Sequence, residues 1–242
     1  MIALMELDQI NDWLWCLRTP IVQAYAVRER DGFIVIDTST AAEDSAILEV
    51  LGTVERHAGR VRIYEILLTH GHDDHIGSAA ALAERTGARV IAARDEAPTI
   101  SRDRPPPPPV LLDWERALFE AVTPNVPPAA PVRPDQLVDD GHRLGWEREA
   151  TIIATPGHTP GHISVLFERE RVLVAGDALA SHDGRPMVGV FNADPAAATA
   201  TARQLATLDI DTACFGHGEP LRHDAAVRLI EAITPDANGA PR

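Results

Sequence analysis

The sequence contains few of the residues that build disulfide frameworks, membrane spans or nucleic-acid surfaces. Only Cys16 and Cys214 are present in 242 residues, so no disulfide framework is expected. No uninterrupted apolar run approaches the roughly 20 residues that a membrane helix needs, so we expect no membrane partner. The formal charge of −14 argues against nucleic acid as a partner, because phosphate binding requires clustered lysine and arginine.

The N-terminus also lacks the pattern of a secretory signal. Residues 1–17 include Glu6, Asp8 and Asp12 and have no basic start followed by an apolar core. A cytoplasmic location is therefore expected. Apolar residues make up 45% of the chain, which suits one large α/β domain or two small ones.

Strand and helix patterns alternate along most of the chain. Short apolar runs between turn residues predict strands at 13–17, 21–27, 32–37, 61–68, 89–92, 151–155, 163–167, 171–177 and 212–215. Helical spacing predicts helices at 41–57, 76–86, about 195–208 and 224–233. Asp194-Pro195 has the sequence of a helix cap followed by proline at the first helical position. This alternation indicates an α/β sandwich.

A proline-rich insertion at about 98–135 interrupts the alternation. Ten of the 19 prolines lie between Pro105 and Pro134, including five in a row at 105–109, and this composition predicts stiff, extended chain. One short helix is predicted over Val110–Val122. Three roles remain open for the insertion: a surface linker whose helix is packed down by Trp114, a lid that shapes substrate entry, or a dimer surface.

The most informative motif directly follows the apolar run at 64–68. It reads His70-Gly71-His72-Asp73-Asp74-His75 and contains four potential metal ligands in six residues. Three further candidates stand at the starts of similar turns: His158, Asp177 and His217. A Gly-His or Gly-Asp pair alone is an ordinary turn feature, but the whole set in this order is specific. Five histidines and two aspartates are what two neighbouring divalent ions need.

The spacing of these residues suggests how they divide. His70 and His72 are two apart, so in an extended segment their rings point the same way and can hold one ion. Asp74 and His75 are adjacent, and their side chains are expected to diverge towards a second ion. His158 and His217 can complete the two sets, and Asp177 can bridge both ions through its two oxygens.

With these residues in this order, the chain resembles the metallo-β-lactamase-fold hydrolases over nearly its whole length, in particular their glyoxalase II-like and lactonase-like branch. The resemblance implies a single domain over 1–242 with a four-layer αβ/βα sandwich. It assigns one ion to His70, His72 and His158, the other to Asp74, His75 and His217, and Asp177 to both. It also gives Asp37 the role of orienting a ligand histidine. His162, four residues after His158, is a further candidate for such a role.

Two close divalent cations predict the chemistry. A water between ions about 3.5–4 Å apart loses its proton near neutral pH and attacks, while the substrate oxygen leans on one ion. Asp74 is predicted to orient that hydroxide as well as to bind metal. Zinc is the expected metal, although histidine and aspartate sites also accept iron, manganese or cobalt.

The substrate is less well defined by the sequence. We expect a small molecule containing an ester, lactone or thioester bond. Lactonases of this kind usually carry a tyrosine shortly after the bridging aspartate, where this chain has Ala178-Leu179-Ala180. The alternatives are a mononuclear non-haem iron persulfide dioxygenase and a β-lactam, phosphodiester or sulfate-ester hydrolase on the same fold. Trp114, Phe119 and Phe191 are candidates for the walls of the substrate pocket, and a homodimer is a further expectation.

Overall fold

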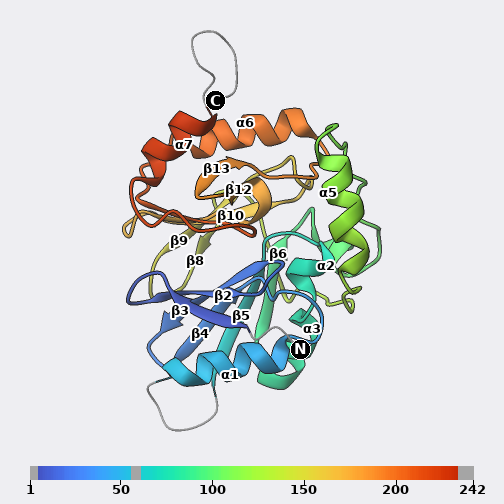
Figure 1. Ribbon diagram of the computed structural model, residues 1–242. Helices are drawn as coiled ribbons and strands as arrows, with labels where there is room; N and C mark the ends of the chain where they lie inside the picture. The colour runs from blue at the N-terminus through green and yellow to red at the C-terminus, as the bar shows by residue number, and fades with distance from the viewer. Residues whose placement is uncertain (1–4, 56–60, 234–242) are drawn as a thin grey trace. The chain divides into compact units, whose positions relative to one another are not determined.

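Figure 1 shows a computed structural model of the chain, which describes residues 5–55 and 61–233. The chain divides into two compact units, Met1–Pro106 with Val122–Val138 and Pro107–Ala121 with Asp139–Arg242. The proline-rich insertion is therefore shared between the units. One domain over 1–242 stays a prediction. Among the described residues, no helix is both long and apolar enough to cross a membrane.

The first unit is built on a seven-stranded sheet whose spatial order follows the chain. Its strands are β1 (Glu6–Gln9), β2 (Leu14–Arg18), β3 (Gln23–Glu29), β4 (Gly32–Ile36), β5 (Ile63–Leu68), β6 (Arg89–Ala93) and β7 (Gln136–Val138). Strands β1 to β4 pair antiparallel, and β4 to β7 pair parallel. The parallel half is the part that places the metal-ligand motif.

Helices α1 (Asp44–Val54) and α3 (Ala79–Thr86) lie along one face of this sheet (Figure 1). Ile47 and Leu51 of α1 share a buried core with Phe33 and Val35 of β4. Phe33 and Val35 are two apart, so both side chains point to the same face of the strand. The helix predicted over 76–86 is α3, which begins later, at Ala79, and a separate short helix, α2 (Asp73–Ile76), precedes it. As predicted, α3 stops at Gly87, which adopts a left-handed φ of 74°.

The second unit contains a five-stranded sheet in the order β14-β11-β10-β9-β8. Its strands are β8 (Arg143–Leu144), β9 (Ala150–Ala154), β10 (Ile163–Phe167), β11 (Val172–Val174) and β14 (Thr212–Cys214). Helices α6 (Pro195–Leu205) and α7 (Ala225–Ile233) contribute Leu205 and Leu229 to a core that includes Leu173 and Phe215. The predicted cap of α6 is confirmed: the Asp194 carboxylate accepts from two backbone N–H groups of the first turn, both at 3.0 Å.

Several short strands were not predicted. Besides β1, β7 and β8, the chain forms a hairpin of β12 (Leu179–His182) and β13 (Arg185–Val188). Its turn is Asp183-Gly184, and both residues have positive φ, 50° and 73°. Asp-Gly between two strands is the common signal for such a turn, so the sequence did contain the information.

The helix of the insertion begins later than predicted. Helix α5 spans Glu115–Val122, followed by a 3-10 turn η1 (Thr123–Asn125), and not Val110–Val122. The N–H of Leu112 donates to the Glu115 side chain at 2.8 Å, so the residues before Glu115 form a side-chain-capped turn. Trp114 is 55% exposed, so the prediction that it packs this helix down is wrong.

Candidate metal centre

In the first unit, the parallel pair β4 and β5 places the site residues. The carboxyl ends of parallel neighbours meet at one edge of a sheet, and this is where ligands bind in open α/β sheets. Asp37 directly follows β4, and Thr69 and His70 follow β5. The Asp37 N–H continues the pairing by donating to the Leu67 carbonyl at 2.8 Å. Residues more than thirty positions apart in the printed sequence are thereby brought into contact.

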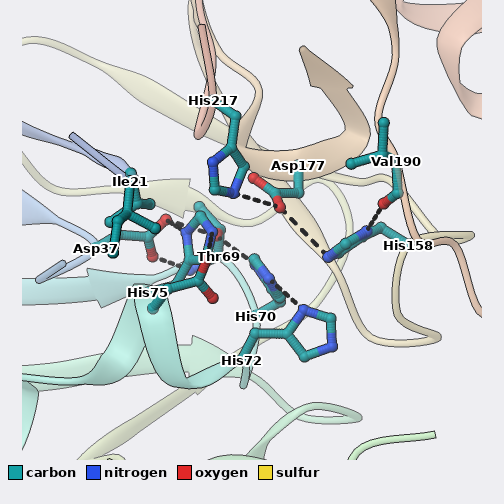
Figure 2. Close-up of polar contacts among 12 residues, drawn as sticks. Ile21, Asp37, Thr69, His70, His72, His75, His158, Asp177, Val190 and His217 are labelled. Atoms are coloured by element: carbon teal, nitrogen blue, oxygen red, sulfur yellow. Dashed lines mark hydrogen bonds and ion pairs between the residues drawn. The ribbon is translucent and has the colours of Figure 1, made fainter. Parts of the chain in front are cut away.

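The Asp37 carboxylate organises this edge. It accepts from the Thr69 N–H at 2.8 Å and from the Thr69 hydroxyl at 2.7 Å. The oxygen that accepts from the hydroxyl also lies 2.9 Å from His75 Nδ1, as Figure 2 shows. Asp37 is buried and has a left-handed φ of 59°, a conformation that aspartate tolerates better than most residues. The contact has the geometry that the predicted orienting role requires, and the role itself stays a prediction.

These bonds decide which nitrogen of each ring carries the proton. Since an ionised carboxylate only accepts, His75 donates through Nδ1, and its Nε2 is the nitrogen that can bind a metal. Thr69 gives its hydroxyl proton to Asp37, so its oxygen accepts from His70 Nδ1 at 3.0 Å. His70 therefore also presents Nε2. One carboxylate fixes the tautomer of two predicted ligands, one directly and one through a hydroxyl.

The remaining predicted ligands of the motif, His72 and Asp74, lie at the start of α2. His72 Nδ1 is 3.1 Å from His70 Nε2. Two nitrogen ligands of a tetrahedral zinc ion lie about 3.3 Å apart when each Zn–N distance is about 2.0–2.1 Å. Asp74 pairs instead with His75, at 3.9 Å between Oδ2 and Nε2. The motif thus divides into the same two pairs that the spacing predicts to serve different ions.

Residues outside the motif hold its loop in place. The Gly71 N–H donates to the buried Glu96 carboxylate at 3.0 Å, and Arg102 donates to the Gly71 carbonyl at 3.0 Å. Arg102 also pairs with Asp73, which accepts from the Ala129 N–H at 2.9 Å. Asp73, the one acidic residue of the motif not assigned to a metal, therefore has a structural use.

In the second unit, three strands that run in the same direction place the predicted ligands. Strands β9 and β11 are both antiparallel to β10, and β14 is parallel to β11. The carboxyl ends of β9, β11 and β14 consequently lie at one edge. They lead to His158, to Asp177 in the 3-10 turn η2 (Gly176–Ala178), and to His217.

Asp177 lies between the two histidines of this unit. Its Oδ2 is 3.4 Å from His158 Nε2 and 3.2 Å from His217 Nε2 (Figure 2). Both separations match the spacing of about 3.3 Å between two ligands of one tetrahedral ion. His158 and Asp177 are buried, whereas the His217 side chain is 29% exposed. This carboxylate can therefore share one ion with each histidine.

His158 is oriented through its other ring nitrogen. Its Nδ1 lies 3.0 Å from the carbonyl oxygen of Val190, a group that only accepts. The proton is therefore on Nδ1, and Nε2, the nitrogen facing Asp177, is the one that can bind a metal. His158 thus presents the same nitrogen as His70 and His75 in the first unit.

His162 contacts Asp177 through the backbone. Its Nε2 accepts from the Asp177 N–H at 3.0 Å, which places the ring proton on Nδ1, 2.7 Å from the Thr155 hydroxyl. Thr155 lies 3.0 Å from the Ser164 hydroxyl, which donates to the Ala175 carbonyl at 3.0 Å. This buried network holds the backbone just before η2, at Ala175, and within it, at Asp177. His162 is placed to orient Asp177, and that role stays a prediction.

Two glycines allow the backbone to turn sharply beside the ligands. Gly157, before His158, has a φ of 136°, and a Cβ there would lie 2.2 Å from the backbone nitrogen of Ala198. Gly218, after His217, has a φ of 86°, and its Cβ would lie 1.9 Å from the Ser181 carbonyl oxygen. A side chain fits at neither position, so the ligand turns require glycine.

Two of the three predicted pocket residues contact each other. The rings of Phe119 and Phe191 pack edge to face, with centroids 5.1 Å apart. Trp114 directly precedes the helix that carries Phe119, and it is largely exposed. Their roles towards a substrate stay predictions.

The supporting residues were missed by sequence reasoning: Thr69, Glu96, Arg102, Glu115, Thr155 and Ser164. The sequence does contain a signal for Thr69, because this residue directly precedes His70, the first predicted ligand. The others carry no signal of their own, since their partners lie on other strands and loops.

Comparison with known proteins identifies the class. A family model described as the metallo-beta-lactamase superfamily matches residues 17–217. The probable metallo-hydrolase YflN of Bacillus subtilis is 30% identical over 226 residues, covering 85% of this chain and 83% of that protein. A metallo-beta-lactamase family protein from Thermus thermophilus has a TM-score of 0.70 at 26% identity, over 92% of this chain and 79% of that one. The chain therefore belongs to the metallo-beta-lactamase superfamily of hydrolases, and the predicted family and fold class are confirmed.

Other relatives are named for a reaction. A hydroxyacylglutathione hydrolase of Acidiphilium cryptum is 34% identical over 214 residues, covering 83% of this chain and 72% of that protein. One from Cereibacter sphaeroides is 36% identical over 158 residues, but this match covers 64% of the chain and only 49% of that relative. A subclass B3 metallo-beta-lactamase of Bradyrhizobium japonicum has a TM-score of 0.65 at 22% identity, over 99% of this chain and 86% of that one, which shows the shared fold alone.

Proposed function

We propose that this chain is a two-metal hydrolase of small esters, lactones or thioesters. In this proposal His70, His72 and His158 hold one divalent ion, and Asp74, His75 and His217 hold the other. Asp177 is shared between them. Zinc is the proposed metal, because it suits imidazole and carboxylate ligands, with iron, manganese and cobalt as alternatives.

The position of Asp177 between two imidazole nitrogens is the observation that carries the proposal. A buried carboxylate 3.4 Å and 3.2 Å from two different Nε2 atoms has the donor set and spacing of a bridging ligand. The first unit supports this with its two separate ligand pairs. His70, His75 and His158 each use Nδ1 for a hydrogen bond to the protein, which is typical of metal-binding histidines.

Bound divalent ions would lower the pKa of a water molecule between them and polarise the substrate oxygen. The residues of the chain supply orientation and charge. Asp74 accepts a hydrogen bond from the attacking water and aims it. The carboxylates of Asp74 and Asp177 balance part of the cationic charge. The hydrogen bonds that Asp37, Thr69 and Val190 accept from the ring Nδ1–H groups keep the histidine rings from rotating as charge develops during the reaction.

A thioester is the first substrate class to test. Two relatives described above are named hydroxyacylglutathione hydrolases, and their substrate is a thioester of a small acid. An ester or lactone presents the same carbonyl group to the attacking water. We propose a small-molecule substrate and no nucleic-acid partner, since the net charge is −14.

The test is a proton-release screen on metal-loaded protein. It compares S-lactoylglutathione, simple thioesters, acyl-homoserine lactones, phosphodiesters and a β-lactam. Asp74→Asn is the inactive variant, and Asp113→Asn is its matched control, because the Asp113 carboxylate is fully exposed. We expect turnover of one carbonyl class that disappears in Asp74→Asn and survives in Asp113→Asn.

Metal analysis of the same samples separates the proposal from its alternatives. Two ions per chain with hydrolysis agree with it. Hydrolysis of a phosphodiester or β-lactam, but of no thioester, ester or lactone, would contradict the proposed substrate class. One iron per chain with no hydrolysis would favour the mononuclear dioxygenase and overturn the proposal.

A further inference from the structure

A single peptide group joins His158 to a buried carboxylate. The carbonyl of Val190 accepts the proton of His158 Nδ1 at 3.0 Å. The N–H of the same peptide group, which belongs to Phe191, donates to Glu115 Oε1 at 3.0 Å. Histidine, peptide and carboxylate therefore form one continuous hydrogen-bonded chain within the second unit.

Glu115 is unusual for a residue of a proline-rich insertion. It stands at the start of α5 and is only 2% exposed. Both carboxylate oxygens accept backbone protons, one from Phe191 and the other from Leu112 at 2.8 Å. A buried glutamate requires such partners, because burying an unsatisfied carboxylate is costly. The Glu115 carboxylate is thus held against the loop that carries Val190, whose carbonyl accepts from His158.

The 189–194 loop is fixed from two sides. On one side, the Ala193 N–H donates to the His158 carbonyl at 3.1 Å. On the other side, the Val110 N–H donates to the Asn192 carbonyl at 2.8 Å, and Phe119 packs on Phe191. Phe191 has a φ of 58°, which a bulky residue adopts only when surrounding contacts impose it. The loop is held in an unfavourable conformation that presents its 190–191 peptide to both partners.

We propose that Glu115 is a positioning residue for His158 and acts through the Val190–Phe191 peptide. A negative charge on the N–H end of a peptide polarises it and makes its carbonyl a stronger acceptor. The stronger acceptor holds the His158 proton on Nδ1 and keeps Nε2 basic and correctly aimed. Asp37 does the same for His75 by direct contact. This inference rests on the proposed function only in treating His158 as a metal ligand.

The proposal gives the proline-rich insertion a role different from a linker, a lid or a dimer surface. The insertion would supply the carboxylate that orients His158 through the 189–194 loop, whose own carboxylate, that of Asp194, caps α6. The competing explanation is that Glu115 merely docks α5 on the 189–194 loop. Phe119 docks the same helix on the same residue, Phe191, without taking part in the hydrogen-bonded chain. If docking alone matters, Phe119→Ala should disturb His158 as much as a substitution of Glu115 does. If the carboxylate orients His158, Phe119→Ala should leave the His158 ring unchanged.

The first measurement concerns the ring of His158 in metal-free protein. Long-range ¹H–¹⁵N NMR of histidine-labelled protein reports the tautomer of each ring, assigned by a His158→Gln variant. We expect the wild type to show His158 as the Nδ1–H tautomer. Glu115→Ala should give a mixture of tautomers, and Glu115→Gln, which keeps an acceptor but not the charge, an intermediate result. Phe119→Ala and the exposed Glu120→Gln should leave the wild-type signal unchanged.

The second measurement is metal retention against a chelator. Loss of a group that orients a ligand histidine typically lowers metal affinity by about 10–100-fold, and we expect about 10-fold for Glu115→Ala because it acts through a peptide. The loss should affect one of the two ions. Thermal unfolding of each variant identifies any that fail to fold, and Glu115→Gln then carries the comparison.

Each outcome decides between the explanations. An unchanged His158 tautomer in folded Glu115→Ala would overturn the proposal, as would an equal effect of Phe119→Ala. If the wild type bound no metal, the proposed function would fail, whereas the tautomer measurement would still decide the role of Glu115.

Discussion

The two groups of predicted ligands are organised in different ways. In the first unit, four predicted ligands lie within six residues, and Asp37, which contacts Thr69 and His75, directly follows the neighbouring strand β4. In the second unit, His158, Asp177 and His217 follow three separate strands. Their rings and backbone are held through a peptide group and a relay of hydroxyls. The first group depends on one local motif, and the second depends on the assembled sheet.

This difference predicts which substitution should disturb the most predicted ligands in each unit. One substitution at Asp37 should disturb two ligands of the first unit, since both His70 and His75 depend on its carboxylate. In the second unit, the supporting contacts described above reach one predicted ligand each: Val190 accepts from His158, and His162 accepts from the Asp177 N–H. There, Asp177 itself is the residue on which both histidines converge.

The largest effect is therefore expected from Asp177→Ala. It removes the carboxylate that both histidines of the second unit face. Since loss of a mere supporting partner costs about 10–100-fold, we expect turnover to fall by roughly 1,000-fold or more, with loss of bound metal. The check is turnover and metal content beside Asp211→Ala, a carboxylate of the same unit outside the ligand group. Full activity in Asp177→Ala would refute the bridging role.

The dependence of the second group on close packing is tested by Gly157→Ala. The new Cβ would overlap the backbone of Ala198, and the positive φ adds strain, so we expect the free energy of unfolding to fall by about 3 kcal/mol. Gly87→Ala is the matched control: its φ is also positive, but nothing lies within 4 Å of the new Cβ. It should cost about 1 kcal/mol. Equal losses in urea unfolding would show that packing at the His158 turn is unimportant.

In the first group, Asp37→Asn and Thr69→Val separate the direct from the indirect contact. Asparagine tolerates the left-handed φ of position 37, but an NH2 group replaces one of the two oxygens with which Asp37 accepts hydrogen bonds. We expect about 10–100-fold weaker metal binding in Asp37→Asn, with both ions affected. Thr69→Val should weaken mainly the ion assigned to His70. The hypothesis of one organising carboxylate fails if the two variants give the same pattern in chelator titrations.

The smallest effect concerns a carboxylate outside both groups. Burial, together with the adjacent charge of Asp44, raises the pKa of Glu43 above its usual value of 4.5. A carboxyl with a raised pKa stabilises the fold below its ordinary pKa, and this contribution is lost as the pH rises through the folded-state value. Relative to Glu43→Gln, the wild type should therefore lose a little stability on going from about pH 4 to pH 7.

Urea unfolding at the two pH values measures this change. The control is Glu49→Gln on α1, the helix that Glu43 directly precedes. A wild type that gains stability over this range relative to Glu43→Gln would contradict the prediction. The result matters for the comparison because the supporting carboxylates of the two units, Asp37 and Glu115, accept hydrogen bonds from backbone N–H groups, whereas Glu43 lies beside a like charge.

Much of the fold could be predicted because its signals are local. Apolar runs between turn residues predicted the long strands, and Asp194-Pro195 predicted the start of α6 to the residue. The short strands β7 and β8 escaped because two or three residues carry too little periodicity. The start of α5 was wrong because the Glu115 side chain caps the turn before it, a contact that spacing alone does not reveal.

The candidate site divides in the same way. The six-residue motif is evident in the sequence, since its four predicted ligands lie so close together. His158, Asp177 and His217 were found only as members of an ordered set. Glu115 was not found at all, because nothing in the sequence relates it to a loop 76 residues away. Partners that meet only through the assembled sheet and its loops leave no local pattern.

The most direct test of the central claim is anomalous X-ray diffraction from crystals of the zinc-loaded protein at the zinc edge. The account predicts two anomalous peaks per chain, one bound by His70, His72 and His158 and the other by Asp74, His75 and His217, with Asp177 bound to both. A single peak, or two peaks that do not share Asp177, would contradict it.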